Sequence, residues 1–124
     1  MKGRWFAVLG ALAAAIAVAG DAYGSHGLPG KVSAALVERF ARAMHYLLLH
    51  GVALAAIGPR LNSIAERLSL ATVALGMLLF SGALALSVLW PVWHWTRLAP
   101  VGGTLLIAGW LLLAVATLFR RGGG

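Results

Sequence analysis

Cysteine is absent from this sequence, and only three of its 124 residues are acidic. Without cysteine the chain forms no disulfide and has no thiolate chemistry, so it gives no indication of a redox compartment. Charged residues of both signs make up 10% of the chain, whereas an average soluble domain has about 25%. This composition is not that of an ordinary water-soluble domain.

Hydrophobic residues make up 61% of the chain, compared with about 45–50% in an average soluble protein. The net charge of +7 would suit a surface that binds nucleic acid, but the ten basic residues stand in small groups between long apolar runs. Such groups are typical of the flanks of membrane helices rather than of one basic face. We therefore expect a membrane protein with no nucleic-acid partner.

The apolar runs predict an all-α fold, an integral membrane four-helix bundle that forms a single transmembrane domain over residues 1–124. We expect spans at about 5–23, 44–58, 70–89 and 99–119, with an amphipathic interfacial helix at about 31–43. That helix either bends or runs directly into the second span, since its apolar residues recur at helical spacing.

The first apolar run also resembles a secretory signal peptide, because Lys2 and Arg4 precede it and residues 17–19 read Ala-Val-Ala. A run of about 19 residues is nevertheless long enough to cross the bilayer, and three further spans follow. We therefore expect a retained helix.

Small residues and glycines predict how the first segments are arranged. Small residues recur at every fourth position of the first span, where they would let a neighbouring helix approach closely. They are Gly3, Ala7, Ala11, Ala15 and Ala19. Residues 20–30 contain four glycines and a proline, which indicates a turn-rich connection. A second, short loop is expected at 60–69.

The candidate polar site lies on the second span. Arg42, Tyr46 and His50 are four residues apart and so share one face of a helix that descends into the membrane. Lipid offers no hydrogen bonds, so these groups must face protein, water or a ligand. In the functional interpretation, Asp21 and His26 converge with them in a polar pocket, where Asp21 or Glu38 offsets the arginine.

A structural interpretation accounts for the same residues. Arg42 would extend to the interface, Tyr46 would join an aromatic belt, and His50 would bond a carbonyl of a neighbouring helix. Metal or haem is a minor alternative, because His45 and His50 point about 140° apart around a helix. The chain also lacks a His-x-x-x-His motif and the carboxylate–histidine spacing of a di-metal helix bundle. We expect no metal, no cofactor and no catalytic residue.

Five further residues are expected to serve helix packing. Ser81 and Gly82 mark a close helix crossing in the third span. Gly102 and Gly103 open the fourth span, where their backbone N–H groups would also suit an anion, although close packing is the favoured purpose. Gly109 lies further along the same span.

Basic residues predict the orientation. With four spans both termini lie on one side, together with Lys2, Arg4, Arg60, Arg67, Arg120 and Arg121. The other side carries Lys31, Arg39, Arg42 and Arg97. The larger group favours termini and middle loop in the cytoplasm.

Five short motifs occur in order along the chain. They are GSHGL at 24–28, the Tyr46 and His50 pair, LFSG at 79–82, APVGG at 99–103 and Gly109-Trp110. Together they resemble the small membrane family of bacterial YgdD and YwdK and eukaryotic transmembrane protein 256, a domain of unknown function. The resemblance implies a four-helix membrane protein without an established activity. Asp21 and Leu47 depart from the family pattern, so the resemblance implies that any polar network typical of the family is altered here.

The function expected from these observations is non-enzymatic. We expect an accessory or structural subunit of a bacterial inner (cytoplasmic) membrane assembly, whose partners are the lipid bilayer and either other membrane subunits or further copies of itself. The alternative is a binding or transport module with a polar pocket for a small anion, lipid headgroup, quinone or proton path. A haem- or metal-binding redox subunit is the minor alternative.

Overall fold

Four long helices make up most of the computed structural model, which describes residues 3–120. The helices are α1 (Arg4–His26), α2 (Ala34–Ile57), α3 (Ile64–Leu89) and α4 (Ala99–Leu118), with 3-10 helices at Gly58–Arg60 and Trp95–Leu98. Each long helix has the length and hydropathy needed to cross a bilayer. The expected all-α fold with four membrane-spanning helices is therefore confirmed.

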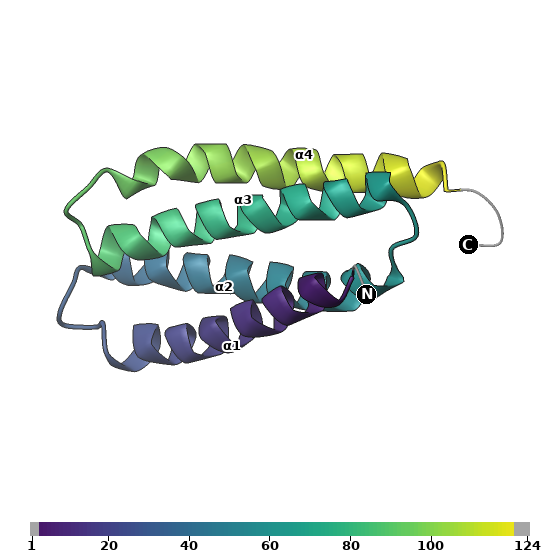
Figure 1. Cartoon of the computed structure of the whole chain (residues 1–124). Coiled ribbons are helices and arrows are strands. Elements are labelled where there is room, and N and C mark those ends of the chain that lie inside the picture. The colour runs from purple at the N-terminus through teal and green to yellow at the C-terminus, as the bar shows by residue number, and fades with distance from the viewer. Residues whose placement is uncertain (1–2, 121–124) are drawn as a thin grey trace.

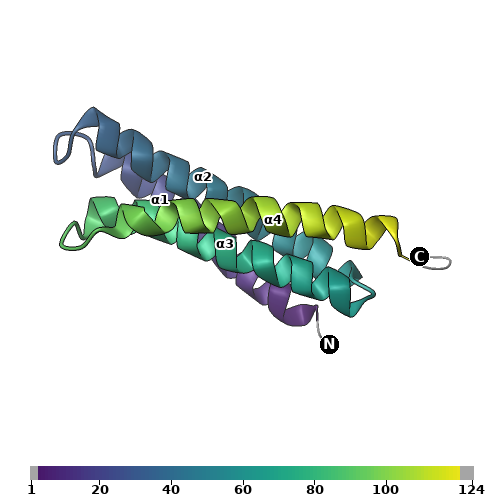
Figure 2. The ribbon, with the colours of Figure 1, turned by 90° about the horizontal axis from the view of Figure 1, so that it is seen from above.

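The helices run up and down and lie side by side in chain order (Figures 1 and 2). The main packing contacts join α1 with α2, α2 with α3, and α3 with α4. The bundle thus consists of two helical hairpins that meet through α2 and α3. The start of α1 and the end of α4 lie at the same end of the bundle (Figure 1).

Backbone contact between glycines holds α1 against α2. A Cβ atom placed on Gly51 would lie only 2.7 Å from the carbonyl oxygen of Gly10, and Ala13 and Ala17 are buried along the same face. Of the four-residue repeat, Gly3 packs against the backbone of Gly58. Ala11, Ala15 and Ala19 of that repeat are exposed.

The prediction of a turn-rich connection over 20–30 was wrong for its first part, because α1 continues to His26. Gly24 serves helix packing here, since a Cβ atom would lie 2.9 Å from the ring of Phe40 on α2. The actual loop covers 27–33 and turns at Gly30, whose φ of 87° favours glycine. Leu28 in this loop is 3% exposed and closes that end of the core.

The amphipathic segment expected at 31–43 continues directly into the second span as part of α2. Ser33 caps this helix, its side chain accepting the N–H of Leu36 at 3.3 Å. Near the same end, Arg39 donates to the Ser87 hydroxyl of α3 at 3.2 Å. The bond from Arg39 to Ser87 links the second hairpin to the first at the polar end of α2.

Glycines also bring α3 and α4 together. A Cβ atom on Gly109 would lie 2.8 Å from the backbone nitrogen of Val73, and Gly102 lies against the backbone of Phe80. Gly103 is less closely packed, because its Cβ atom would make an ordinary 3.7 Å contact with the ring of Phe80. Around Gly82, by contrast, a Cβ atom would meet nothing within 4 Å.

We predict opposite effects from the same substitution at two helical glycines. Gly51→Ala places a methyl group against the α1 backbone, so we expect a loss of about 1–3 kcal/mol of stability. The methyl group added by Gly82→Ala would contact no other atom. The higher helix propensity of alanine should therefore stabilise this variant by about 0.5–1 kcal/mol. Thermal unfolding in mild detergent measures both. Equal stability of the two variants would contradict the backbone contact between α1 and α2.

Candidate functional site

His50 is the buried end of the polar face on α2, with 5% of its surface exposed. Its Nδ1 lies 2.8 Å from the backbone oxygen of Tyr46, and because a carbonyl oxygen only accepts, Nδ1 carries the proton. Nε2 then accepts the indole N–H of Trp110 on α4 at 3.0 Å. A neutral imidazole therefore links α2 to α4, with both nitrogens engaged.

Tyr46 and Arg42 precede His50 on the same helix face, and both are exposed on the surface of the bundle. The Tyr46 ring stacks on the imidazole with centroids 5.8 Å apart and tilts against Phe80 at 4.6 Å. Tyr46 is 40% exposed, and Arg42 is exposed as well. Arg42 and Tyr46 line a shallow groove of about 320 Å³ together with Glu38 and His45.

Asp21 and His26 do not join His50. The Asp21 carboxylate lies 3.6 Å from Nε2 of His45, which projects from a different side of α2. His26 is the exposed last residue of α1. Because residues 20–26 are helical rather than a turn, these two side chains remain on α1 and do not complete the predicted pocket. Within residues 3–120 no salt bridge joins Arg42 to Asp21 or Glu38.

The described residues contain no cluster of side chains that could bind a metal ion. No group of three or more histidine or acidic side chains there is arranged to hold an ion. His50 also has both ring nitrogens bonded to other groups, so neither is available to haem iron without breaking a contact between helices.

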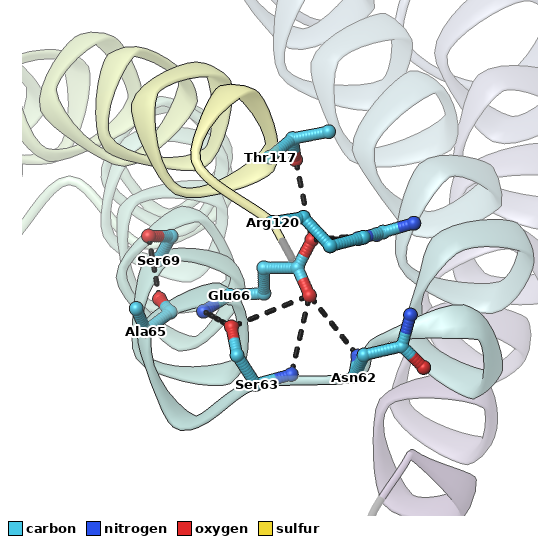
Figure 3. A network of polar contacts seen from close by, with 7 residues as sticks. All are labelled: Asn62, Ser63, Ala65, Glu66, Ser69, Thr117 and Arg120. Carbon is cyan, nitrogen blue, oxygen red and sulfur yellow. Dashed lines mark hydrogen bonds and ion pairs between the residues drawn. The ribbon is translucent and has the colours of Figure 1, made fainter. Parts of the chain in front are cut away.

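A second polar cluster, which sequence reasoning missed, surrounds Glu66 at the start of α3 (Figure 3). The side chain is completely buried. Its Oε1 accepts the backbone N–H groups of Asn62 at 3.0 Å and Ser63 at 3.2 Å. The Ser63 hydroxyl in turn accepts the N–H of Glu66 at 3.1 Å, which completes a capping box.

The other carboxylate oxygen of Glu66 joins α3 to the end of α4. Arg120 donates to Oε2 through Nε at 3.0 Å and through a terminal nitrogen at 2.5 Å. The Thr117 hydroxyl is 3.4 Å from the same oxygen. All of these groups are visible in Figure 3. The carboxylate is thus fully engaged and fastens the two helices at one end.

The sequence did contain a signal for half of this cluster. Residues 60–69 were predicted to form a loop, but α3 begins at Ile64. A serine followed three residues later by glutamate, before an apolar run, is the signature of a capped helix start. The partnership with Arg120 has no comparable local signal, because 54 positions separate the two residues.

We predict that His50 contributes to stability and that the Tyr46 hydroxyl does not. His50→Ala leaves the Trp110 N–H unpaired inside the bundle, which should cost about 1–3 kcal/mol. Tyr46→Phe keeps both ring contacts and should stay within about 0.5 kcal/mol of wild type. Thermal unfolding and tryptophan emission of both variants are the measurement. If Tyr46→Phe were as damaging as His50→Ala, the hydroxyl would have a role that the described contacts do not include.

A separate prediction concerns the Glu66 cluster. Arg120→Ala leaves a buried carboxylate without its charged donor. We expect it to lower the free energy of unfolding by about 1.5–3 kcal/mol, the contribution of a hydrogen bond to a charged group. Adding Glu66→Gln removes the stranded charge, so the double variant should regain part of the loss. Arg60→Ala, at an exposed arginine of the same bundle end, is the control in the same unfolding assay. Equal effects of Arg120→Ala and Arg60→Ala would count against the fastening role.

Comparison with known proteins agrees with this architecture. The model of the family "Protein of unknown function (DUF423)" matches residues 20–103. A UPF0382 membrane protein of Staphylococcus aureus is 37% identical over 116 residues, which cover 92% of this chain and 95% of that protein. Its counterpart in Staphylococcus epidermidis is 38% identical over 115 residues, which cover 91% and 94%.

A third relative, a UPF0382 membrane protein of Staphylococcus haemolyticus, is 35% identical over 92% of this chain and 95% of its own length. No solved structure matches the chain. The family match covers most of the chain and the relatives cover nearly all of it, which confirms the resemblance found in the motifs. The chain therefore belongs to the DUF423 family of membrane proteins of unknown function.

Proposed function

We propose that this protein is a non-enzymatic accessory or structural subunit of a membrane assembly. The observation that supports the proposal is how its polar groups are distributed. The buried histidine and glutamate bond to other helices of the same chain, so they stabilise the bundle. The outer faces of the two end helices stay uncovered and are available to another membrane protein or a second copy.

The uncovered faces belong to α1 and α4. Only 17% of the most apolar part of α1 and 22% of that of α4 is buried inside the chain, against 39% and 44% for α2 and α3. On α1 the face turned away from α2 carries exposed Ala11, Ala15 and Ala19. Small residues at this spacing let a neighbouring helix approach closely, which favours a protein partner at α1.

The proposed location is the bacterial cytoplasmic membrane, with both termini in the cytoplasm. Arg4, Arg60, Arg67 and Arg120 lie near the bundle end where α1 begins. Lys2 and Arg121, which belong to the same predicted group, lie outside the described residues. Counted over the sequence, six basic residues against four at the other end support a cytoplasmic side.

The alternative of a polar binding or transport pocket at Arg42, Tyr46 and His50 has less support. His50 already has a partner for each ring nitrogen, and Asp21 lies against His45 instead. A ligand at this place would have to displace the bond to Trp110. The contacts therefore favour a role for this face in joining helices.

Native mass spectrometry of the protein taken from its own membrane in mild detergent tests the proposed function. We expect a stoichiometric companion protein or a defined oligomer with the wild-type chain. The double variant Ala11→Leu/Ala15→Leu should lose the companion protein or the oligomer, because the larger side chains prevent another helix from packing closely on the exposed face of α1.

Ala114→Leu, at an exposed position of α4, is the matched control and should keep the companion if it docks on α1. A wild-type monomer without a companion would overturn the proposal of a subunit. Loss of the companion in the control but not in the α1 variant would move the docking face to α4.

A further inference from the structure

A cleft of about 380 Å³ lies between α1 and α3, with α2 as its floor. Its deep wall consists of buried residues, namely Ala13, Met44, Leu47 and Ser81. Its rim consists of bulky exposed side chains, with Leu12 58%, Ile16 59% and Leu78 47% exposed. Gly82 and Ala85 complete the α3 side. The cleft lies on a different side of α1 from the exposed alanines.

The single polar side chain of this cleft has no partner. Ser81 is 2% exposed, and its hydroxyl is the buried side-chain group without a hydrogen bond in residues 3–120. The other hydroxyls of α3 and α4 behave differently. Each of them bonds a backbone carbonyl of its own helix or the Glu66 carboxylate, namely Ser69, Thr72, Ser87, Thr104 and Thr117.

The depth of Ser81 excludes water as its usual partner. At a rise of 1.5 Å per residue, it lies about 12 Å from the end of α3 at Leu89 and about 26 Å from the start at Ile64. A hydrocarbon core is about 30 Å thick, so the hydroxyl lies well inside it. A hydroxyl in hydrocarbon needs an acceptor from the protein or from a molecule dissolved in the membrane.

We propose that this cleft binds a linear apolar chain that carries one hydrogen-bond-accepting oxygen, with the Ser81 hydroxyl as donor to a carbonyl group. The volume falls in the range of small-molecule sites, about 300–1,000 Å³. The lining is otherwise apolar and has no charged side chain. A charged headgroup or an inorganic anion therefore does not fit, whereas a hydrocarbon chain with one carbonyl does.

The shape of the cleft favours a flexible chain over a helix of another protein. Its lining runs from residue 9 to 16 on α1 and from 78 to 85 on α3, which corresponds to about two helical turns or 10 Å. A docking helix needs a longer face of small residues along its contact. Here the floor on α2 consists of Met44 and Leu47, and the bulky side chains of Leu12, Ile16 and Leu78 form the rim.

Photo-crosslinking of the full chain in nanodiscs tests the proposal. The nanodiscs consist of ether-linked phospholipids, whose chains carry no ester carbonyl. One probe is a straight-chain ketone with a terminal diazirine, and the other is the alkane of equal length with the same diazirine. Mass spectrometry then locates and quantifies the labelled peptides.

With wild type we expect saturable labelling at 9–16 and 78–85, with the ketone favoured by about two- to tenfold, the factor that one neutral hydrogen bond supplies. Ser81→Ala should reduce the ketone to the level of the alkane. Ser69→Ala, the same change at a hydroxyl of α3 that already bonds Ala65, should keep the preference.

Gly82→Leu provides an independent test, because it fills the cleft at a position where a Cβ atom meets nothing within 4 Å. It should abolish labelling by both probes while the helical content by circular dichroism stays unchanged. Equal labelling by the two probes in wild type, an unchanged preference in Ser81→Ala, or no labelling of the two segments would each overturn the proposal.

Discussion

The structure depends on one constraint, which is that a polar group inside hydrocarbon must find its partner within the protein. His50 meets this requirement through Tyr46 and Trp110, and helix hydroxyls such as Thr72 meet it through a carbonyl of their own helix. Where such a bond crosses between helices, as from His50 to Trp110 and from Glu66 to Arg120, it also holds the two helices together. A few polar side chains therefore fasten helices to one another, even though they are a small minority of the chain. Ser81 is notable in the described residues because it departs from this rule.

Glycine determines how close those neighbours come. Gly10 and Gly51 bring α1 to α2, and Gly102 and Gly109 bring α3 to α4, in both cases at backbone distance. Between the two hairpins, side chains such as Arg39 and Ser87 make the connection instead. The two hairpins are thus tightly packed units, and a cleft remains where α1 and α3 are separated by side chains rather than joined by glycine.

The sequence predicted the four spans and the family, because runs of about 20 apolar residues and ordered motifs are local signals. Prediction from the sequence failed where one residue type, such as glycine, can either form a turn or allow close helix packing. The glycines of 20–30 indicate a turn, yet Gly24 belongs to a helix and packs on Phe40. The four-residue repeat of alanines was real but lies on the outer face of α1. The bonds of His50 to Trp110 and of Glu66 to Arg120 could not be predicted, because 60 and 54 positions separate the partners.

The contact between Arg120 and Glu66 also has a consequence for the order in which the chain is made. Synthesis proceeds from the N-terminus, so the carboxylate enters the membrane boundary long before its guanidinium partner exists. During that interval the local donors to the charge are the backbone N–H groups of Asn62 and Ser63 and the Ser63 hydroxyl. The second hairpin is therefore completed at its open end, after the last turn of α4 has left the ribosome. The contact of Arg120 with Glu66 is thus a late closure of the bundle.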